Sequence, residues 1–84
     1  MLGDLVRELA EAKVALKVKR SDENEKRLNL AYAALRKVGV DYQTARFVAE
    51  DYIREHRDEF VAMMQEMKNA ENDYRGKHTA VLAG

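Results

Sequence analysis

The chain has 84 residues, with fifteen basic and fifteen acidic side chains and no cysteine or proline. This length allows one small domain, and the lack of cysteine excludes disulfides and thiolate metal sites. No apolar run approaches the roughly 20 residues that span a bilayer, and the acidic first turns are unlike a signal peptide, so we expect a soluble, cytoplasmic protein without a membrane partner.

Apolar residues recur at spacings of three and four, and strict alternation is absent, so the sequence predicts an all-α protein. The first helix is expected over residues 4–19, with Asp4 as its N-cap. Its apolar residues form a seam with the 3–4 spacing typical of coiled coils. The seam comprises Leu2, Leu5, Leu9, Ala12 and Leu16.

A charged connector leads to the second predicted helix, which covers residues 23–38. Either Ser21 or Asp22 can cap it, because short polar side chains accept hydrogen bonds from the free N–H groups of a first turn. Gly39 follows the helix and suits the left-handed position at which many helices end.

The third predicted helix covers residues 42–75, with Asp41 as its cap and Gly76 at its end. At 1.5 Å per residue it would be on the order of 50 Å long, about twice the length of either earlier helix. A break near Arg57–Asp58, where Asp58 could cap a new helix, is the alternative. His56 lies on the apolar stripe of this helix, and we expect it to be a hydrogen-bonded histidine in the core or an interface.

These elements predict a single helical domain over residues 1–76 and a flexible C-terminal tail over residues 77–84. Two shorter helices and one long C-terminal helix would form a helical bundle or a coiled-coil-like oligomer. Either the first two helices pack along different stretches of the long helix, or a second copy of the chain covers the remainder.

Several apolar residues fall outside the main apolar stripe when the chain is placed at 100° per residue around each helix. Off-stripe residues on every predicted helix indicate a second contact surface, although helices that bury two sides would give the same pattern. We therefore expect a homo-oligomer, most simply a dimer, or a protein partner. The residues of this predicted interaction surface are Val14, Val18, Leu30, Phe47 and Val61.

The stretch over residues 31–54 resembles the helix-turn-helix of small phage repressors. The apolar or small residues that carry the resemblance are Leu35, Val38, Gly39, Val40, Ala45 and Val48. The resemblance implies a recognition helix that enters the major groove of DNA. Its candidate contacts to bases or phosphates are Gln43, Thr44 and Arg46.

The charge distribution disfavours nucleic-acid binding. Residues 41–84 hold nine acids and six bases, and Glu50 and Asp51 would face phosphates. The densest basic group lies around the connector between the first and second predicted helices. It comprises Lys13, Lys17, Lys19, Arg20, Lys26 and Arg27. Nucleic acid is accordingly the less favoured partner.

No catalytic, cofactor-binding or metal-binding residues are expected. The sequence has no Gly-rich phosphate loop or nucleophile motif, and Ile53 stands where a helical carboxylate–histidine metal site would need an acid before His56. We therefore expect a non-enzymatic protein that acts by protein–protein interaction as an assembly, adaptor or inhibitor protein, in the style of a bacterial or phage accessory protein. The alternative is a small nucleic-acid-binding regulator.

Overall fold

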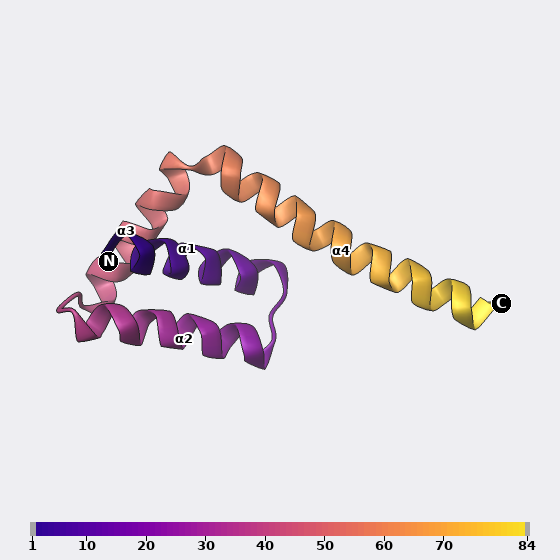
Figure 1. The fold of residues 1–84 in the computed structure, drawn as a ribbon, viewed down its shortest axis with the longest axis horizontal. Helices are drawn as coiled ribbons and strands as arrows, with labels where there is room; N and C mark the ends of the chain where they lie inside the picture. Colours follow the sequence, from indigo (N-terminus) through magenta and orange to yellow (C-terminus); the bar gives the residue numbers. More distant parts are fainter. Residues whose placement is uncertain (1, 84) are drawn as a thin grey trace.

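The computed structural model describes the backbone of residues 2–83 and the side chains of residues 2–70. The described backbone is helical and contains no strand, which confirms the all-α prediction (Figure 1). The first two helices lie close to their predicted ranges. The helices are α1 (Leu2–Val18), α2 (Asp22–Lys37), α3 (Tyr42–Glu55) and α4 (Arg57–Ala83). Asp4 lies inside the first turn of α1, which begins at Leu2, so its prediction as an N-cap was wrong.

The caps of α2 and α3 and the turn at Gly39 form where the sequence indicated. The Ser21 hydroxyl accepts a hydrogen bond from the Asn24 N–H at 3.2 Å, and the Asp41 carboxylate accepts one from the Thr44 N–H at 2.8 Å. These side chains cap α2 and α3. Gly39 has φ +88°, the left-handed conformation that residues with a Cβ rarely adopt. The chain therefore turns sharply between α2 and α3.

The prediction of one long C-terminal helix was wrong, because the chain bends at His56 between α3 and α4. The His56 N–H donates to the Tyr52 carbonyl at 3.0 Å, and the Phe60 N–H donates to the His56 carbonyl at 3.1 Å. Asp58 lies in the first turn of α4, where a carboxylate is favourable, rather than at the cap. The bend lets α3 cross the N-terminal part of α1 while α4 runs back alongside it (Figure 1).

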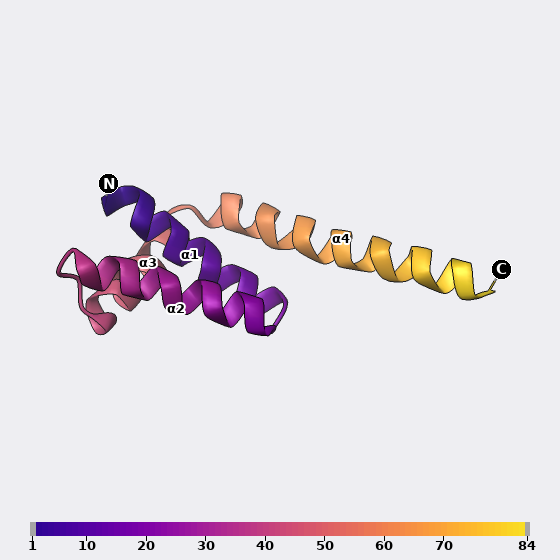
Figure 2. The same cartoon turned by 60° about the horizontal axis from the view of Figure 1, so that its bottom comes forward.

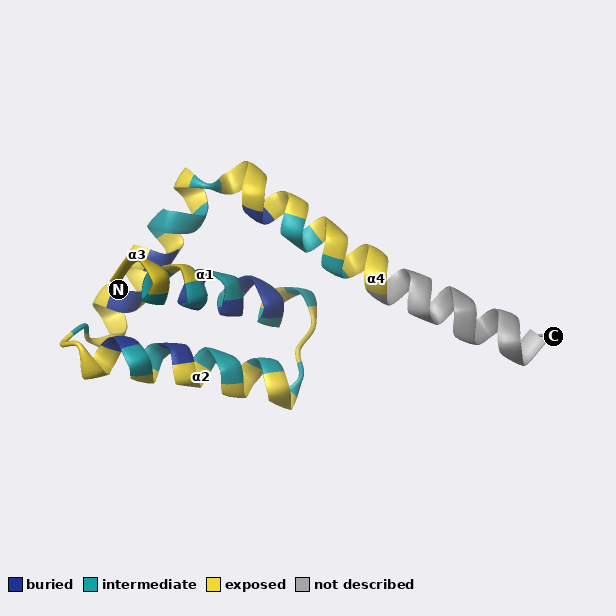
Figure 3. Cartoon of the chain, viewed as in Figure 1, coloured by how far each residue is buried: buried dark blue, intermediate teal, exposed yellow. Residues whose placement is uncertain are grey.

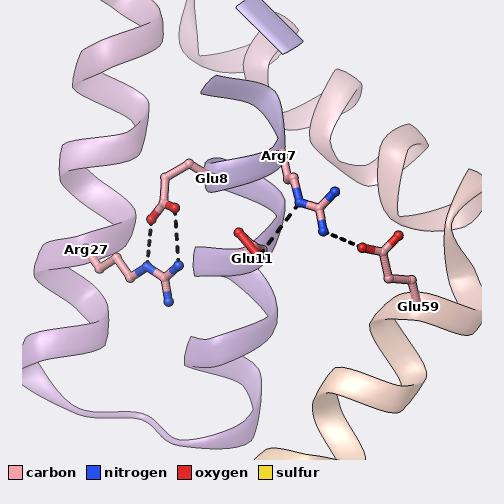
Figure 4. Close-up of polar contacts among 5 residues, drawn as sticks. All are labelled: Arg7, Glu8, Glu11, Arg27 and Glu59. Atoms are coloured by element: carbon pink, nitrogen blue, oxygen red, sulfur yellow. Dashed lines mark hydrogen bonds and ion pairs between the residues drawn. The ribbon is translucent and has the colours of Figure 1, made fainter. Parts of the chain in front are cut away.

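The helix α1 is the centre of the fold, with α2 and α4 on either side of it, as two views agree (Figures 1 and 2). Adjacent residues of α1 form ion pairs with different neighbours (Figure 4). Glu8 accepts two hydrogen bonds from Arg27 of α2, at 2.7 and 3.3 Å. Arg7 pairs with Glu59 of α4. Charged side chains thus flank the contacts of the central helix with α2 and α4.

Two apolar clusters hold α1 in place. The first joins α1 to α2 and α3 and consists of Leu9, Ala12, Ala31, Leu35, Ala45 and Ala49. The second joins α1 to α4 and consists of Ala10, Val14 and Phe60. On α2 the buried positions face α1 and the outer side is exposed (Figure 3). Because most of these buried residues are alanines, the helices approach closely but bury few large side chains.

Two further expectations concern the C-terminal part of the chain and the absence of a membrane-spanning helix. The predicted helix end at Gly76 was wrong, because the backbone of α4 continues to Ala83. The flexible tail over residues 77–84 stays a prediction. Among the described residues, no helix combines the length and the apolar character that a bilayer crossing requires.

Candidate protein-interaction groove

The structure separates the five residues of the predicted interaction surface. Val14 is only 4% exposed and packs against Phe60, which corrects its assignment to an outer face. The reason is the bend at His56, which brings α4 onto a second side of α1. Val18 is half-buried in a separate hollow that α1, α2 and α4 line. The residues that remain more than half exposed are Leu30, Phe47 and Val61.

Val14 and Val61 line the same groove, at the inner side of the bend between α3 and α4. This elbow groove has a volume of about 420 Å³ and is bounded by α1, α3 and α4. Its lining is mainly apolar. The apolar floor consists of Val14, Ile53, Phe60, Val61 and Met64. Leu30 and Phe47 lie outside the groove, so the five predicted residues do not form one continuous surface.

The rim of the elbow groove is basic. Its cations are Lys13, Lys17, Arg54 and Arg57, and its one acid is Glu50. Lys13 pairs with Glu50 at 3.2 Å, and Arg54 pairs with Asp51 at 3.3 Å. Lys17 and Arg57 form no ion pair with any other residue in the part of the chain whose side chains are described. The groove therefore presents a surplus of positive charge around an apolar floor.

Glu50 is held as a carboxylate at the edge of the groove. The hydrogen bond and charge of Lys13 lower the pKa of Glu50, and Arg46, at 3.4 Å from the same oxygen, lowers it further. The two cations offset the negative charge of Glu50. The acid consequently subtracts little from the positive character that Lys17 and Arg57 give to the rim.

Aromatic side chains pack against one another across the bend that forms the groove. The His56 ring stacks on Tyr52 with centroids 4.1 Å apart, and Tyr52 meets Phe60 edge to face at 5.9 Å. The Nδ1 of His56 lies 3.0 Å from the Tyr52 carbonyl, to which it donates a hydrogen bond. His56 is half-buried. The prediction of a hydrogen-bonded histidine is therefore confirmed, and its place is the junction of α3 and α4.

Sequence reasoning missed the basic rim as a feature. Sequence reasoning places Lys13 and Lys17 only in a basic group around the connector between the first two helices. It treats Arg57 only as a possible helix break and does not single out Arg54. A signal was present, because Lys13 and Lys17 are four residues apart and Arg54 and Arg57 are three apart, spacings that share a helix face. Their meeting around one groove depends on the bend at His56.

The residues proposed to contact nucleic acid lie at the start of α3. Gln43, Thr44 and Arg46 are all exposed. Arg46 forms an ion pair with Glu50, and the Thr44 N–H is used by the Asp41 cap. The side chains are therefore accessible, but the one cation among them is already paired with a carboxylate.

Within residues 2–70, no group of three histidine, aspartate or glutamate side chains could hold a metal ion. Comparisons with protein-family models, curated proteins and solved structures find no match for this chain.

The pKa values of two carboxylates predict how stability depends on pH. The Thr44 N–H lowers the pKa of Asp41 below its ordinary 3.8, and Lys13 lowers that of Glu50 below 4.5. A lowered folded-state pKa gives stability that is present above the unfolded-state value and is lost as the pH falls through the folded-state value. We expect the urea midpoint to fall on acidification from about pH 5 to about pH 3.

The double variant Asp41→Asn, Glu50→Gln should show a smaller fall, because asparagine retains a capping oxygen and neither amide titrates. Circular dichroism at several pH values measures the midpoints. Equal falls in the variant and the natural chain would contradict the assignment.

Proposed function

We propose that this chain is a small, non-enzymatic helical protein that acts through protein–protein interaction and that associates with itself, most simply as a dimer. The observation that carries the proposal is the number of large apolar side chains left in solvent by so small a chain. Among residues 2–70, those more than half exposed are Leu2, Leu30, Val38, Tyr42, Phe47 and Val61. The proposed location is the cytoplasm, and the proposed roles are assembly, adaptor or inhibitor functions of a bacterial or phage accessory protein.

The size of the core supports the same proposal. Leu9 and Leu35 are the largest fully buried side chains within the part of the chain whose burial is described. Burial stabilises by roughly 25 cal/mol per Å² of apolar surface, so a core built largely of alanine leaves a small chain with a narrow margin. Covering Leu30 and Phe47 with another chain would add apolar burial that the single chain lacks.

The test is the absolute mass by light scattering after gel filtration at several concentrations. We expect the mass to rise toward that of a dimer, and Leu30→Asp or Phe47→Asp to return it to the 9.7 kDa monomer. Both side chains are exposed, at 62% and 66%, so the substitutions should leave the helical content unchanged.

Asn29→Asp is the matched control, because it adds the same charge at an exposed neighbour of Leu30. A mass of 9.7 kDa at every concentration would contradict self-association. So would a dimer that both aspartate variants leave intact.

A nucleic-acid-binding regulator is the second candidate. It is supported by the exposure of Gln43, Thr44 and Arg46 on the helix that follows the Gly39 turn. The bases and acids around Arg46 offer little net positive charge, whereas phosphate contacts dominate the affinity of such proteins. Loss of salt-dependent DNA binding in Arg46→Ala, with the mass unchanged, would favour this candidate over the first.

A further inference from the structure

We infer that the elbow groove binds an acidic, amphipathic helix of another protein. This inference rests on the proposed interaction function and names the class of partner. The groove joins a floor of apolar side chains from three helices to a rim of four cations and one paired acid. A helix with leucine-type residues on one face and carboxylates beside them matches both features.

The apolar floor of the groove is recessed, so it can accept apolar side chains that protrude from a partner helix. Val14 and Phe60 are each 4% exposed and form its deepest part, while Val61 is 54% exposed and forms its accessible part. Met64 adds an unbranched, adaptable side chain of the kind that accommodates varied apolar partners. A helix laid along the open side of the groove would pack its side chains between those of α1, α3 and α4 without separating these helices.

The rim selects for negative charge. Lys17 and Arg57 are exposed and form no ion pair among the described side chains, so they are available to carboxylates of a partner. Arginine in particular can donate two parallel hydrogen bonds to one carboxylate. A basic or neutral helix would leave these cations facing like charge or no charge, which disfavours it.

A protein segment suits the groove better than an anionic membrane surface does. The apolar residues at the bottom are recessed between three helices, and a flat bilayer cannot reach Val14 or Phe60 without separating α1 from α4. A helix can insert single side chains into such a recess. The exposed rim cations alone would give a vesicle only weak, salt-sensitive attraction.

The test uses a fluorescein-labelled peptide of about 18 residues, five helical turns, with leucines on one face and glutamates on the others. Anisotropy should show saturable binding to the full-length protein. The same peptide with lysine in place of glutamate should bind at least about tenfold more weakly. Vesicles that contain phosphatidylserine, measured by co-sedimentation, should not retain the protein at about 0.15 M salt.

Two variants probe the rim and the floor separately. Lys17→Glu with Arg57→Glu should weaken binding of the acidic peptide by about tenfold or more, since two attractions become repulsions. Val61→Asp should weaken it through the floor. The matched control is Lys26→Glu with Lys68→Glu, which makes the same charge change at exposed positions outside the groove and should bind as the natural chain does.

Three results would overturn the inference: equal binding of both peptides, unchanged binding in Lys17→Glu with Arg57→Glu, or retention on vesicles without peptide binding. A lower oligomer mass in Lys17→Glu with Arg57→Glu would also overturn it, because this would show that a second copy of the chain occupies the groove. Failure here is distinguishable from failure of the proposed self-association, which is read from the mass of the Leu30 and Phe47 variants without any peptide.

Discussion

Replacing Phe60 with alanine is expected to release α4 from α1. Phe60 is 4% exposed, packs in a cluster with Ala10 and Val14, and meets Tyr52 edge to face. Phenylalanine-to-alanine changes in a core cost about 3–5 kcal/mol, because both apolar burial and close packing are lost. No other residue of α4 is as fully buried among the described residues. The loss should therefore fall on the contact between α1 and α4.

Amide hydrogen exchange distinguishes local from global opening. In Phe60→Ala we expect amides at the start of α4 to lose protection, while α2 keeps its own through the separate cluster around Leu35. Phe47→Ala is the matched control, because Phe47 is 66% exposed and its truncation should cost less than about 0.5 kcal/mol in the monomer. Equal loss of protection in α2 and α4 would contradict the division of the core into two clusters.

The second large effect is expected for Leu35→Ala. Leu35 is fully buried between α2 and its neighbours α1 and α3, and its carbonyl accepts the Val38 and Val40 N–H groups at 3.1 and 3.0 Å. The truncation should lower the free energy of unfolding by about 2–5 kcal/mol. An 84-residue domain has a total of roughly 4–13 kcal/mol, so the variant would be close to unfolded.

Urea unfolding followed by circular dichroism measures this loss. Leu30→Ala is the control on the same helix, with the same residue types exchanged at a position that is 62% exposed. At concentrations where the chain is monomeric, it should change stability by less than about 0.5 kcal/mol. Similar losses for Leu35→Ala and Leu30→Ala would show that the core is not where the structure places it.

Local signals in the sequence were enough to predict much of the fold. The periodicity of apolar residues located α1 and α2, and the caps at Ser21 and Asp41 and the turn at Gly39 depend only on neighbouring residues. Such features need no knowledge of the rest of the chain, because each side chain satisfies backbone groups within a few residues of itself. They are therefore predictable from sequence alone.

The bend at His56 could not be predicted in this way. No proline or glycine marks it, and the residues on both sides favour a helix. The bend is explained by tertiary packing, since it brings Phe60 onto Ala10 and Val14. The weaker alternative of a break near Arg57–Asp58 was close to the true position, but Asp58 does not act as the cap that this alternative assumed.

The elbow groove was predicted only in part, because it too depends on the bend at His56. A helical projection cannot tell a free face from a second buried face. Val14 was assigned to the predicted interaction surface, but the alternative of a helix that buries two sides holds for it, because α4 covers it. The elbow groove combines residues far apart in sequence, such as Lys17 and Arg57, and exists only because of the bend. Val61 was identified correctly as exposed, while its role in binding stays a prediction.

The most direct test of the interaction account is a nuclear magnetic resonance titration of isotope-labelled protein with the acidic amphipathic peptide. We predict that the largest amide shifts fall at residues 13–17 of α1 and residues 53–64 around the bend, with Leu30 and its neighbours unaffected. Shifts concentrated on the outer side of α2 or at residues 43–47, with the bend unchanged, would contradict the account.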